Sequence, residues 1–361
     1  MRARSMGVEF IDKAKPIRSG EELPWDKVEA FLKDTIPGLQ GDLQVLQFPS
    51  GFSNLTYLVS IGDRELVLRR PPFGTKAETA HDMAREYNIF RALRPVFPYC
   101  PEPLAYCDDP AVTDAPFYVM DRIRGIILRA NPPKGMTLSP EQARSLCENL
   151  VDLWCKLHSL DYHAAGLGDF GKPEGYVRRQ VEGWSRRYRR AKTDDAPDFE
   201  AVMAWLAQTM PADSATPALI HNDYKFDNLV LDPDDPTRII GVLDWEMATI
   251  GDPLMDLGGS LAYWVSPADP DDLQMMRQLP THLPGMLTRD EIVALYAQQM
   301  GREIDSFDFY YCFGLFRLAV IAQQIYYRFY HGQTKDPRFQ MLVFAVQILE
   351  KTARAVIERA G

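Results

Sequence analysis

The octapeptide HNDYKFDN at residues 221–228 and the tetrapeptide LDWE at residues 243–246 constrain the fold of this chain more than any other feature. The first places Asp223 and Asn228 five positions apart, and Asp244 follows Asn228 by sixteen residues. Apolar runs at 218–220 and 239–243 precede the two motifs, so we expect both acids at points where a strand meets a loop. Catalytic groups are often found at such points.

The residue types and their spacing suit phosphoryl transfer. This chemistry needs an acceptor hydroxyl aimed at the phosphate and a divalent metal held by hard oxygen ligands. Asp223 can receive or orient the hydroxyl proton, while Asn228 and Asp244 can offer oxygens to Mg²⁺. Asp-x-x-x-Asp-Asn alone is common in turns and at helix N-caps, so the prediction depends on the two motifs occurring together.

HNDYKFDN and VLDWEMATIGDPLMDL, with GFSNLTYLV and VLRRPPFG upstream, resemble the motifs of the aminoglycoside phosphotransferase and choline kinase family. The likeness runs from about residue 43 to the C-terminal helices and is nearest the branch related to kinase-like domains fused to acyl-CoA dehydrogenases. It implies an α+β, bilobal protein-kinase-like fold with a small antiparallel-sheet N-lobe and a larger, mainly helical C-lobe. It also implies ATP and Mg²⁺ as cofactors, and the following site residues: Asp223 as catalytic base, Asn228 and Asp244 as metal ligands, Ser53 and Asn54 over the phosphates.

Two positions depart from the family pattern. Asn222 stands where the family usually has glycine, and asparagine is the next most tolerant residue if the position needs a positive φ. The strand that normally carries a phosphate-binding lysine corresponds to residues 66–70, which contain no lysine. Val67 and Arg69 would share one face, toward adenine and phosphates respectively, with Arg70 on the other face. Arginine stays protonated and can bind phosphate with two donors, so nucleotide binding is compatible with this change.

Three further segments complete the predicted nucleotide site. Glu86, on an expected amphipathic helix over residues 77–93, would brace Arg69; the alternative is a solvated carboxylate paired with a neighbouring arginine. The segment 51–54 could admit phosphate oxygens or form a plain hairpin turn. By resemblance, Met120 to Arg122 would form the hinge that contacts adenine, and the alternative is a buried edge strand.

Three polar residues near the motifs are predicted to have structural roles. Asp252 is an expected N-cap, with Pro253 in the first helical position. The family resemblance suggests that Asp256 braces the catalytic loop from behind. His221 is expected to be a packed, hydrogen-bonded orienter of the loop, because Asp223 already fills the role of base.

Length and composition predict a folded chain of 361 residues with a sizeable core. We expect a leader with one helix at 1–41, an N-lobe at 42–121 and a C-lobe at 122–361. No apolar run is long enough for a signal peptide or a membrane span, so a cytoplasmic protein without a membrane partner is expected. The five unpaired cysteines predict reduced thiols, and the net charge of −10 argues against a nucleic-acid partner. No feature indicates a homo-oligomer.

The expected acceptor is a small molecule with a hydroxyl group. The basic segment 178–192, with interleaved aromatic residues, could hold an anionic acceptor such as a hydroxyacyl coenzyme A thioester, or form a solvated surface. Arg317 and Arg328, within the apolar segment 313–332, need partners, either acidic side chains or a substrate anion. The leading prediction is an ATP- and Mg²⁺-dependent O-phosphotransferase acting on a metabolite. The alternatives are an aminoglycoside kinase, compatible with the negative net charge, and a nucleotide-binding pseudokinase or regulatory module, suggested by the missing lysine.

Overall fold

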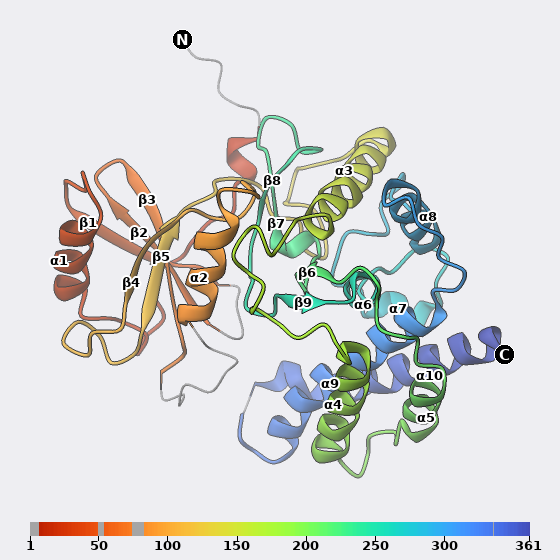
Figure 1. The fold of residues 1–361 in the computed structure, drawn as a ribbon. Coiled ribbons are helices and arrows are strands. Elements are labelled where there is room, and N and C mark those ends of the chain that lie inside the picture. Colours follow the sequence, from red (N-terminus) through yellow and green to blue (C-terminus); the bar gives the residue numbers. More distant parts are fainter. Residues whose placement is uncertain (1–6, 50–53, 74–82, 335) are drawn as a thin grey trace. The chain divides into compact units, whose positions relative to one another are not determined.

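The structure is a computed structural model that describes residues 7–49, 54–73, 83–334 and 336–361. The chain divides into two compact units (Figure 1). The first unit comprises Met1–Ile127, His163–Leu167 and Asn228–Met247, and the second comprises Leu128–Tyr162, Gly168–Asp227 and Ala248–Gly361.

An antiparallel five-stranded sheet with the strand order β1-β2-β3-β5-β4 forms the centre of the first unit. The register pairs Leu55 of β2 with Arg70 of β3, and Val67 of β3 with Met120 of β5. A separate hairpin, β7 with β8, belongs to the same unit and pairs Leu229 with Val242. The elements of this unit are β1 (Leu43–Gln47), β2 (Leu55–Ile61), β3 (Arg64–Arg70), β4 (Pro103–Cys107), β5 (Phe117–Asp121), β7 (Leu229–Leu231), β8 (Ile239–Val242), η1 (Val8–Phe10), α1 (Trp25–Thr35) and α2 (Met83–Leu93).

Helices cover both faces of this sheet, α1 on one side and α2 on the other (Figure 1). Phe117 and Tyr118 are neighbours on β5 and therefore point to opposite faces. The Phe117 ring lies 5.6 Å from Phe31 of α1, and the Tyr118 ring lies 5.9 Å from Phe90 of α2. Burial on both faces explains why β5 reads as a continuous apolar run, in the manner of a covered sheet.

The second unit is mainly helical. Its long helix α9 packs against α4, α6 and α10. Gly258 of α6 and Gly314 of α9 allow these two backbones to approach closely, because a Cβ at either position would overlap the backbone of the other helix. The elements are α3 (Pro140–His158), α4 (Tyr176–Ala191), α5 (Glu200–Gln208), α6 (Pro253–Leu261), α7 (Asp271–Met275), α8 (Arg289–Gln299), α9 (Asp308–Tyr330), α10 (Leu342–Ala360), η4 (Pro337–Met341), and the two-stranded ladder of β6 (Ala218–Ile220) with β9 (Thr249–Gly251).

The predicted α+β class, with one unit built on an antiparallel sheet and one mainly helical unit, is confirmed. The N-cap predicted at Asp252 is also confirmed, because Asp252 caps α6 ahead of Pro253. Ser139 caps α3 with a capping box. The hinge strand β5 ends at Asp121, so Arg122, the last residue of the predicted hinge, follows the strand. Residues 77–82 of the predicted second helix lie outside the described residues, and α2 is described from Met83.

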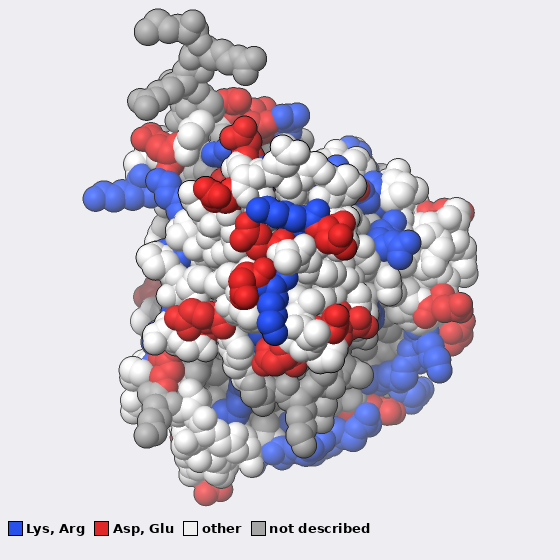
Figure 2. Space-filling model, turned by 90° about the vertical axis from the view of Figure 1, so that its left-hand side faces the viewer, with Lys and Arg blue, Asp and Glu red and all other residues white. Residues whose placement is uncertain are grey.

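The five cysteines are all buried and free, as the sequence predicts for core thiols. Burial raises the pKa of the Cys100 thiol to about 12. No helix in the described part of the chain is long and apolar enough to span a bilayer. On the side of the first unit that faces the viewer in Figure 2, acidic and basic side chains are interspersed among uncharged ones.

Candidate active site

A buried cluster of charged side chains in the first unit is centred on Arg69 of β3. Arg69 is only 7% exposed, and its Nη1 donates to Glu86 Oε1 over 2.8 Å. Its Nη2 donates to Asp244 Oδ1 over 2.9 Å. Glu86 is 2% exposed, so it is a buried brace for Arg69 rather than a solvated helix carboxylate. The structure thus brings together three of the residues predicted for the site.

The two arginines at the end of β3 point in opposite directions, as the strand period predicts. Arg70 Nη1 pairs with Asp114 at 2.8 Å, and its guanidinium lies 4.0 Å from the centroid of the Phe73 ring. Arg69 contacts none of these groups and faces Glu86 and Asp244 instead. Only Arg69 therefore belongs to the charged cluster.

The charge state of the Arg69 cluster follows from its neighbours. Burial alone would lower the pKa of Arg69, but Glu86, Tyr118 and Asp244 outweigh burial and raise it well above its ordinary value. Burial raises the pKa of Glu86, and the Arg69 charge opposes that rise. The Glu86 Oε1 atom also accepts a hydrogen bond from the backbone N–H of Trp245 at 3.1 Å. Arg69 Nε is buried without a hydrogen-bond partner among the described residues, so one guanidinium donor remains available.

Glu246 is a member of the cluster that sequence reasoning missed. Its Oε2 lies 3.6 Å from Arg69 Nη2 and accepts a hydrogen bond of 2.7 Å from Asn54 Nδ2. Asn54 is 3% exposed, so this loop residue is held at the cluster; Ser53 lies outside the described residues. The available signal was the position of Glu246 two residues after Asp244 in the LDWE motif.

The end of the β7–β8 hairpin positions Asn228 beside Asp244. The backbone N–H of Leu243 donates to the Asn228 carbonyl at 2.8 Å, which extends the ladder by one pair beyond Leu229 and Val242. Asp244 has φ 65°, in the left-handed region that costs roughly 1–2 kcal/mol for a residue with a Cβ atom. The chain therefore turns sharply at Asp244, and the local strain falls on a predicted functional residue.

Asp223 lies in the second unit, where Lys225 neutralises it. Lys225 Nζ is 2.6 Å from Asp223 Oδ2 and 3.3 Å from Asp227 Oδ1. Burial would lower the pKa of Lys225, but the two carboxylates outweigh burial and raise it. Burial raises the pKa of Asp227, against the opposing effect of Lys225. Sequence reasoning did not single out Lys225, although it stands two residues after Asp223 in the motif.

Asp256 of α6 braces the loop that carries Asp223. Its Oδ2 accepts from Trp154 Nε1 at 3.0 Å and from the backbone N–H of His221 at 3.2 Å, and lies 3.0 Å from His158 Nε2. Its Oδ1 accepts from the backbone N–H of Asn222 at 2.6 Å. Asn222 has φ 63°, which explains why a residue tolerant of positive φ stands there. The bracing role expected of Asp256 agrees with these contacts.

His221 has the surroundings of an orienting residue. It is fully buried, and its Nδ1 accepts a hydrogen bond from the backbone N–H of Asp223 at 3.2 Å. Burial alone would raise the pKa of Asp256, but the hydrogen bond and charge of His158, with the hydrogen bond from Trp154, hold it below its usual value. Asp256 is therefore an ionised, fully hydrogen-bonded anchor for the loop.

The residues predicted to contact adenine lie on neighbouring strands of the sheet. Val67 and Met120 are cross-strand partners and are 7% and 6% exposed. Arg122 has other partners: its Nη1 binds Glu65 at 3.0 Å, its Nη2 donates to the Asp12 carbonyl at 2.6 Å, and its N–H donates to the Glu65 carbonyl. The side chain of Arg122 is therefore engaged within the first unit.

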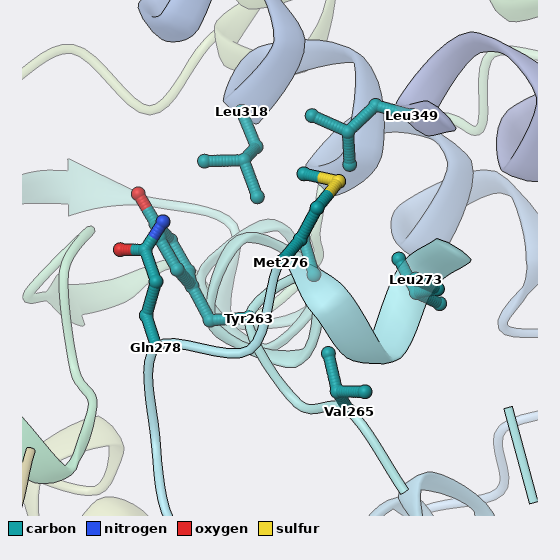
Figure 3. A pocket seen from close by; sticks show the side chains of 8 residues that line it. Tyr263, Val265, Leu273, Met276, Gln278, Leu318 and Leu349 are labelled. Atoms are coloured by element: carbon teal, nitrogen blue, oxygen red, sulfur yellow. The ribbon is translucent and has the colours of Figure 1, made fainter. Parts of the chain in front are cut away.

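A small cavity in the second unit lies beside Tyr263. Its volume is about 10 Å³, and Leu318 of α9 and Leu349 of α10 line it together with Met276 and Gln278 (Figure 3). A cavity of this size holds about one water molecule. It is too small to receive an acceptor.

Comparison with known proteins agrees with this geometry. Residues 44–291 match the model of the phosphotransferase enzyme family. Acyl-CoA dehydrogenase family member 10 of Mus musculus is 34% identical over 332 residues, which cover 91% of this chain and 31% of that protein. The chain spans between 31% and 43% of the length of the acyl-CoA dehydrogenase family members that it matches.

Two solved structures illustrate the likeness of fold. A crystal structure from Ralstonia eutropha JMP134, described as a candidate aminoglycoside phosphotransferase, has a TM-score of 0.79 and 29% identity, and the match covers 94% of this chain and 99% of that one. Choline kinase from Cryptosporidium parvum Iowa II has a TM-score of 0.61 and 13% identity, with coverage of 93% and 98%. At 13% identity the second match shows the fold alone, and that fold is kinase-like.

Proposed function

Because the chain belongs to the phosphotransferase enzyme family, we propose that it is an ATP- and Mg²⁺-dependent O-phosphotransferase acting on a hydroxyl group of a small-molecule metabolite. The observation that carries this proposal is the Arg69 cluster: a buried guanidinium held 2.8 Å from Glu86 and 2.9 Å from Asp244. In this cluster Arg69 would be a fixed cation that binds the phosphates. It lies next to Asp244, the carboxylate that we expect to bind the metal. Arginine can take the place of the usual lysine because it is protonated and offers several donors.

The oxygen donors suit Mg²⁺ that arrives with a nucleotide. Asn228 and Asp244 offer an amide oxygen and a carboxylate at the end of one hairpin. Within the described ranges, no three His, Cys, Asp or Glu side chains form a ready-made metal site. Mg²⁺ prefers six oxygens and commonly keeps waters and substrate phosphates among them, so a sparse protein donor set fits it. When bound, the ion would neutralise charge on the transferring phosphoryl group.

In this proposal Arg69 and Asn54 bind the phosphates of the nucleotide. Glu86 holds the Arg69 side chain in place. The loop residue Ser53 retains the same proposed role. Val67 and Met120 would supply apolar contacts to adenine from adjacent strands. Arg122 would contribute through its backbone carbonyl, because its N–H and its guanidinium already have partners.

Asp223 is the proposed base. As the acceptor oxygen attacks the γ-phosphorus, its proton passes to the Asp223 carboxylate, the bond to the bridging oxygen breaks, and ADP leaves. Lys225 Nζ, 2.6 Å from Asp223 Oδ2, would hold the carboxylate in position for this step. Asp256 and His221 hold the loop backbone through the contacts to Asn222 and Asp223.

The comparisons with known proteins support two classes of acceptor. The acyl-CoA dehydrogenase names of the sequence relatives support a hydroxyacyl coenzyme A thioester as the acceptor. An aminoglycoside kinase is the second candidate, and the description of the Ralstonia structure favours it. A pseudokinase is disfavoured because Asp223, Asn228 and Asp244 are all present, and a pure binder needs no base.

The test is ATP consumption with Mg²⁺ against a panel of hydroxyacyl coenzyme A thioesters, amino alcohols, sugars and aminoglycosides, with Asp223→Asn in parallel. We expect acceptor-dependent turnover in the wild type and a loss of about 10²- to 10⁴-fold in the variant, the range for removal of a general base. Nucleotide affinity should stay nearly unchanged in Asp223→Asn. Nucleotide binding without turnover on any acceptor would favour the pseudokinase alternative.

A further inference from the structure

A second buried arginine, Arg317, lies in the middle of α9 and differs from Arg69 in its surroundings. It is 8% exposed, yet within the described ranges it forms no ion pair and no hydrogen bond. Its guanidinium carbon lies 5.5 Å from the centroid of the Trp184 ring on α4. No Arg317 nitrogen is among the fully buried atoms that lack a hydrogen bond, so the exposed part of this residue includes its charged end, which a ligand can reach. Among the described residues, Arg317 is therefore a largely buried cation without an acidic partner.

The packing around Arg317 keeps space for its guanidinium. Gly259 of α6 faces it, and a Cβ at this position would lie 3.0 Å from Arg317 Nη1. The close approach of α6 and α9 at Gly258 and Gly314 brings the bare backbone of α6 to this point. On the other side, the Trp184 indole is held by a hydrogen bond from Nε1 to Gln180 Oε1 at 3.1 Å. A glycine and an anchored aromatic ring thus both lie next to the cation.

The charged residue of α4 that shares the Trp184 ring with Arg317 is also positive. The Arg187 guanidinium lies 4.5 Å from the same Trp184 ring. Burial lowers the pKa of Arg187, and the charges of Arg186 and Arg317 lower it further. Elsewhere on this helix Arg189 forms an ion pair with Glu200 at 2.7 Å. Among the described residues, a carboxylate therefore pairs with Arg189 but none pairs with Arg187 or Arg317, which share Trp184.

Tyr263 lies near the proposed catalytic loop and is also influenced by the charge of Arg317. Lys225 Nζ lies 5.3 Å from the Tyr263 ring centroid. Burial raises the pKa of Tyr263 to about 12; Asp223 raises it too, while Lys225 and Arg317 lower it. The Tyr263 hydroxyl is thus within electrostatic range of both Asp223 and Arg317, and all these residues belong to the second unit.

We propose that Arg317, with Arg187 and Trp184, binds an anionic group of the acceptor and thereby selects an acidic or phosphate-bearing hydroxyl compound over a polycation. This inference rests on the proposed phosphotransferase function and names the acceptor class for it. A guanidinium donates two parallel hydrogen bonds to a carboxylate or a phosphate, and its charge repels a cationic acceptor. The anionic group would anchor one end of the acceptor while its hydroxyl group reaches Asp223.

Equilibrium binding tests this site without any turnover. Isothermal titration of the full chain would use coenzyme A as the phosphate probe, 3-hydroxybutyrate as the carboxylate probe, and pantetheine as a neutral analogue of coenzyme A that lacks phosphates. We expect Arg317→Met to bind the preferred anionic probe roughly tenfold to a hundredfold more weakly, the range for loss of a charged hydrogen-bonded contact. Arg317→Lys should recover part of the affinity, because it restores the charge without the second donor. The probe that responds identifies phosphate or carboxylate as the anion.

Arg328→Met is the matched control, because Arg328 lies on the same helix and is exposed. It should bind each probe as the wild type does, and pantetheine binding should be the same in every variant. The proposal is overturned if neither anionic probe binds the wild type, or if Arg317→Met and Arg328→Met weaken binding equally. It is also overturned if Arg317→Met weakens ADP binding instead, since the anion would then be a nucleotide phosphate.

A thermal unfolding scan separates loss of a binding site from loss of the fold. Arg317 has no carboxylate partner in the described structure, so Arg317→Met leaves no buried anion behind and should unfold at the same or a higher temperature than the wild type. The anionic probe should raise the unfolding temperature of the wild type but not of Arg317→Met. A clear drop in the variant without ligand would reveal a structural partner and contradict the proposal. Arg317-dependent anion binding in a protein that turns over no acceptor would refute the proposed enzyme function while leaving the anion site in place.

Discussion

Arg69 and Arg317 are buried to nearly the same extent, 7% and 8% exposed, but the chain treats their charges in opposite ways. Glu86, Asp244 and Glu246 surround Arg69 in the first unit. Arg317, in the second unit, has an indole ring, a glycine and another arginine nearby. Arg69, which the protein neutralises, is part of a preorganised framework. Arg317, which has no carboxylate beside it among the described residues, is suited to bind an anion from a ligand. The comparison shows that burial alone does not distinguish a structural charge from a binding charge; the partners do.

The strongest test of this comparison is the matched pair Arg69→Met and Arg317→Met. Arg69→Met leaves Glu86 buried without its cation, which should lower the free energy of unfolding by about 3–5 kcal/mol. Arg317→Met strands no anion and should lower it little or not at all. Urea unfolding of both variants would measure the difference. Equal losses in the free energy of unfolding would show that the different partners of the two arginines do not affect stability.

Asp256→Asn extends the comparison to a buried anion that the chain satisfies fully. An asparagine side chain has one accepting oxygen, because its other terminal atom is an NH₂ donor. It cannot accept all the bonds from Trp154, His221 and Asn222, so we expect the free energy of unfolding to fall by about 2–3 kcal/mol at neutral pH. Acceptor turnover should fall as well, because the loop backbone loses its anchor. Unfolding and turnover measured on one preparation would check both.

The pH dependence of the Asp256 contribution has a defined sign. Hydrogen bonds and the charge of His158 outweigh burial and hold the folded-state pKa of Asp256 below 3.8, its ordinary value. Its contribution to stability is therefore complete above about pH 3.8 and is lost as the pH falls through the folded-state value. Acid unfolding should be less steep in this range for Asp256→Asn than for the wild type. Parallel curves would show that Asp256 is not the titrating group.

Glu246→Gln is a smaller perturbation of the Arg69 cluster. The amide keeps an oxygen for the hydrogen bond from Asn54 but removes the charge 3.6 Å from Arg69. We expect a change in stability of about 1 kcal/mol, since Glu86 and Asp244 still neutralise the arginine. Fluorescence titration with ADP would show whether the loop that carries Asn54 holds the nucleotide less well. A loss as large as that of Arg69→Met would mean that Glu246 is the principal partner.

Gly259→Ala is the finest probe of the Arg317 site. The added Cβ would press on Arg317 Nη1 at 3.0 Å, and the flexible guanidinium can move by a few tenths of an ångström. We expect anion affinity to fall by only about threefold, which is less than the free energy of one hydrogen bond to a charged group. Stability should change little, because alanine favours a helix more than glycine does. Titration with coenzyme A or 3-hydroxybutyrate would measure it. Unchanged affinity for both probes would place the bound anion away from this face of Arg317.

Much of the framework could be predicted from local sequence rules. Strand alternation correctly placed Arg69 and Arg70 on opposite faces, because successive side chains of any strand diverge. Capping chemistry correctly located the start of α6 at Asp252. The tolerance of asparagine for positive φ accounts for Asn222, whose φ is 63°. Each of these properties depends on a residue and its near neighbours in the chain.

Long-range partnerships could not be predicted in this way. Glu246 and Asn54 are 192 positions apart in the sequence, and no periodicity connects them. Lys225 stood beside a motif residue, but its pairing with both Asp223 and Asp227 depends on how the loop folds.

The sequence by itself determined the strands, the helix starts and the family motifs, because these follow from steric and hydrogen-bonding preferences over a few residues. It presented Arg317 and Arg328 as equivalent arginines in one apolar helix. Only the tertiary structure decided between them. Helices α4 and α6 pack next to Arg317 and bury most of it, with no acid beside it among the described residues, while Arg328 reaches the surface near the end of α9. The physical reason is that the solvation of a charge depends on every element packed around it, and those elements come from distant parts of the chain.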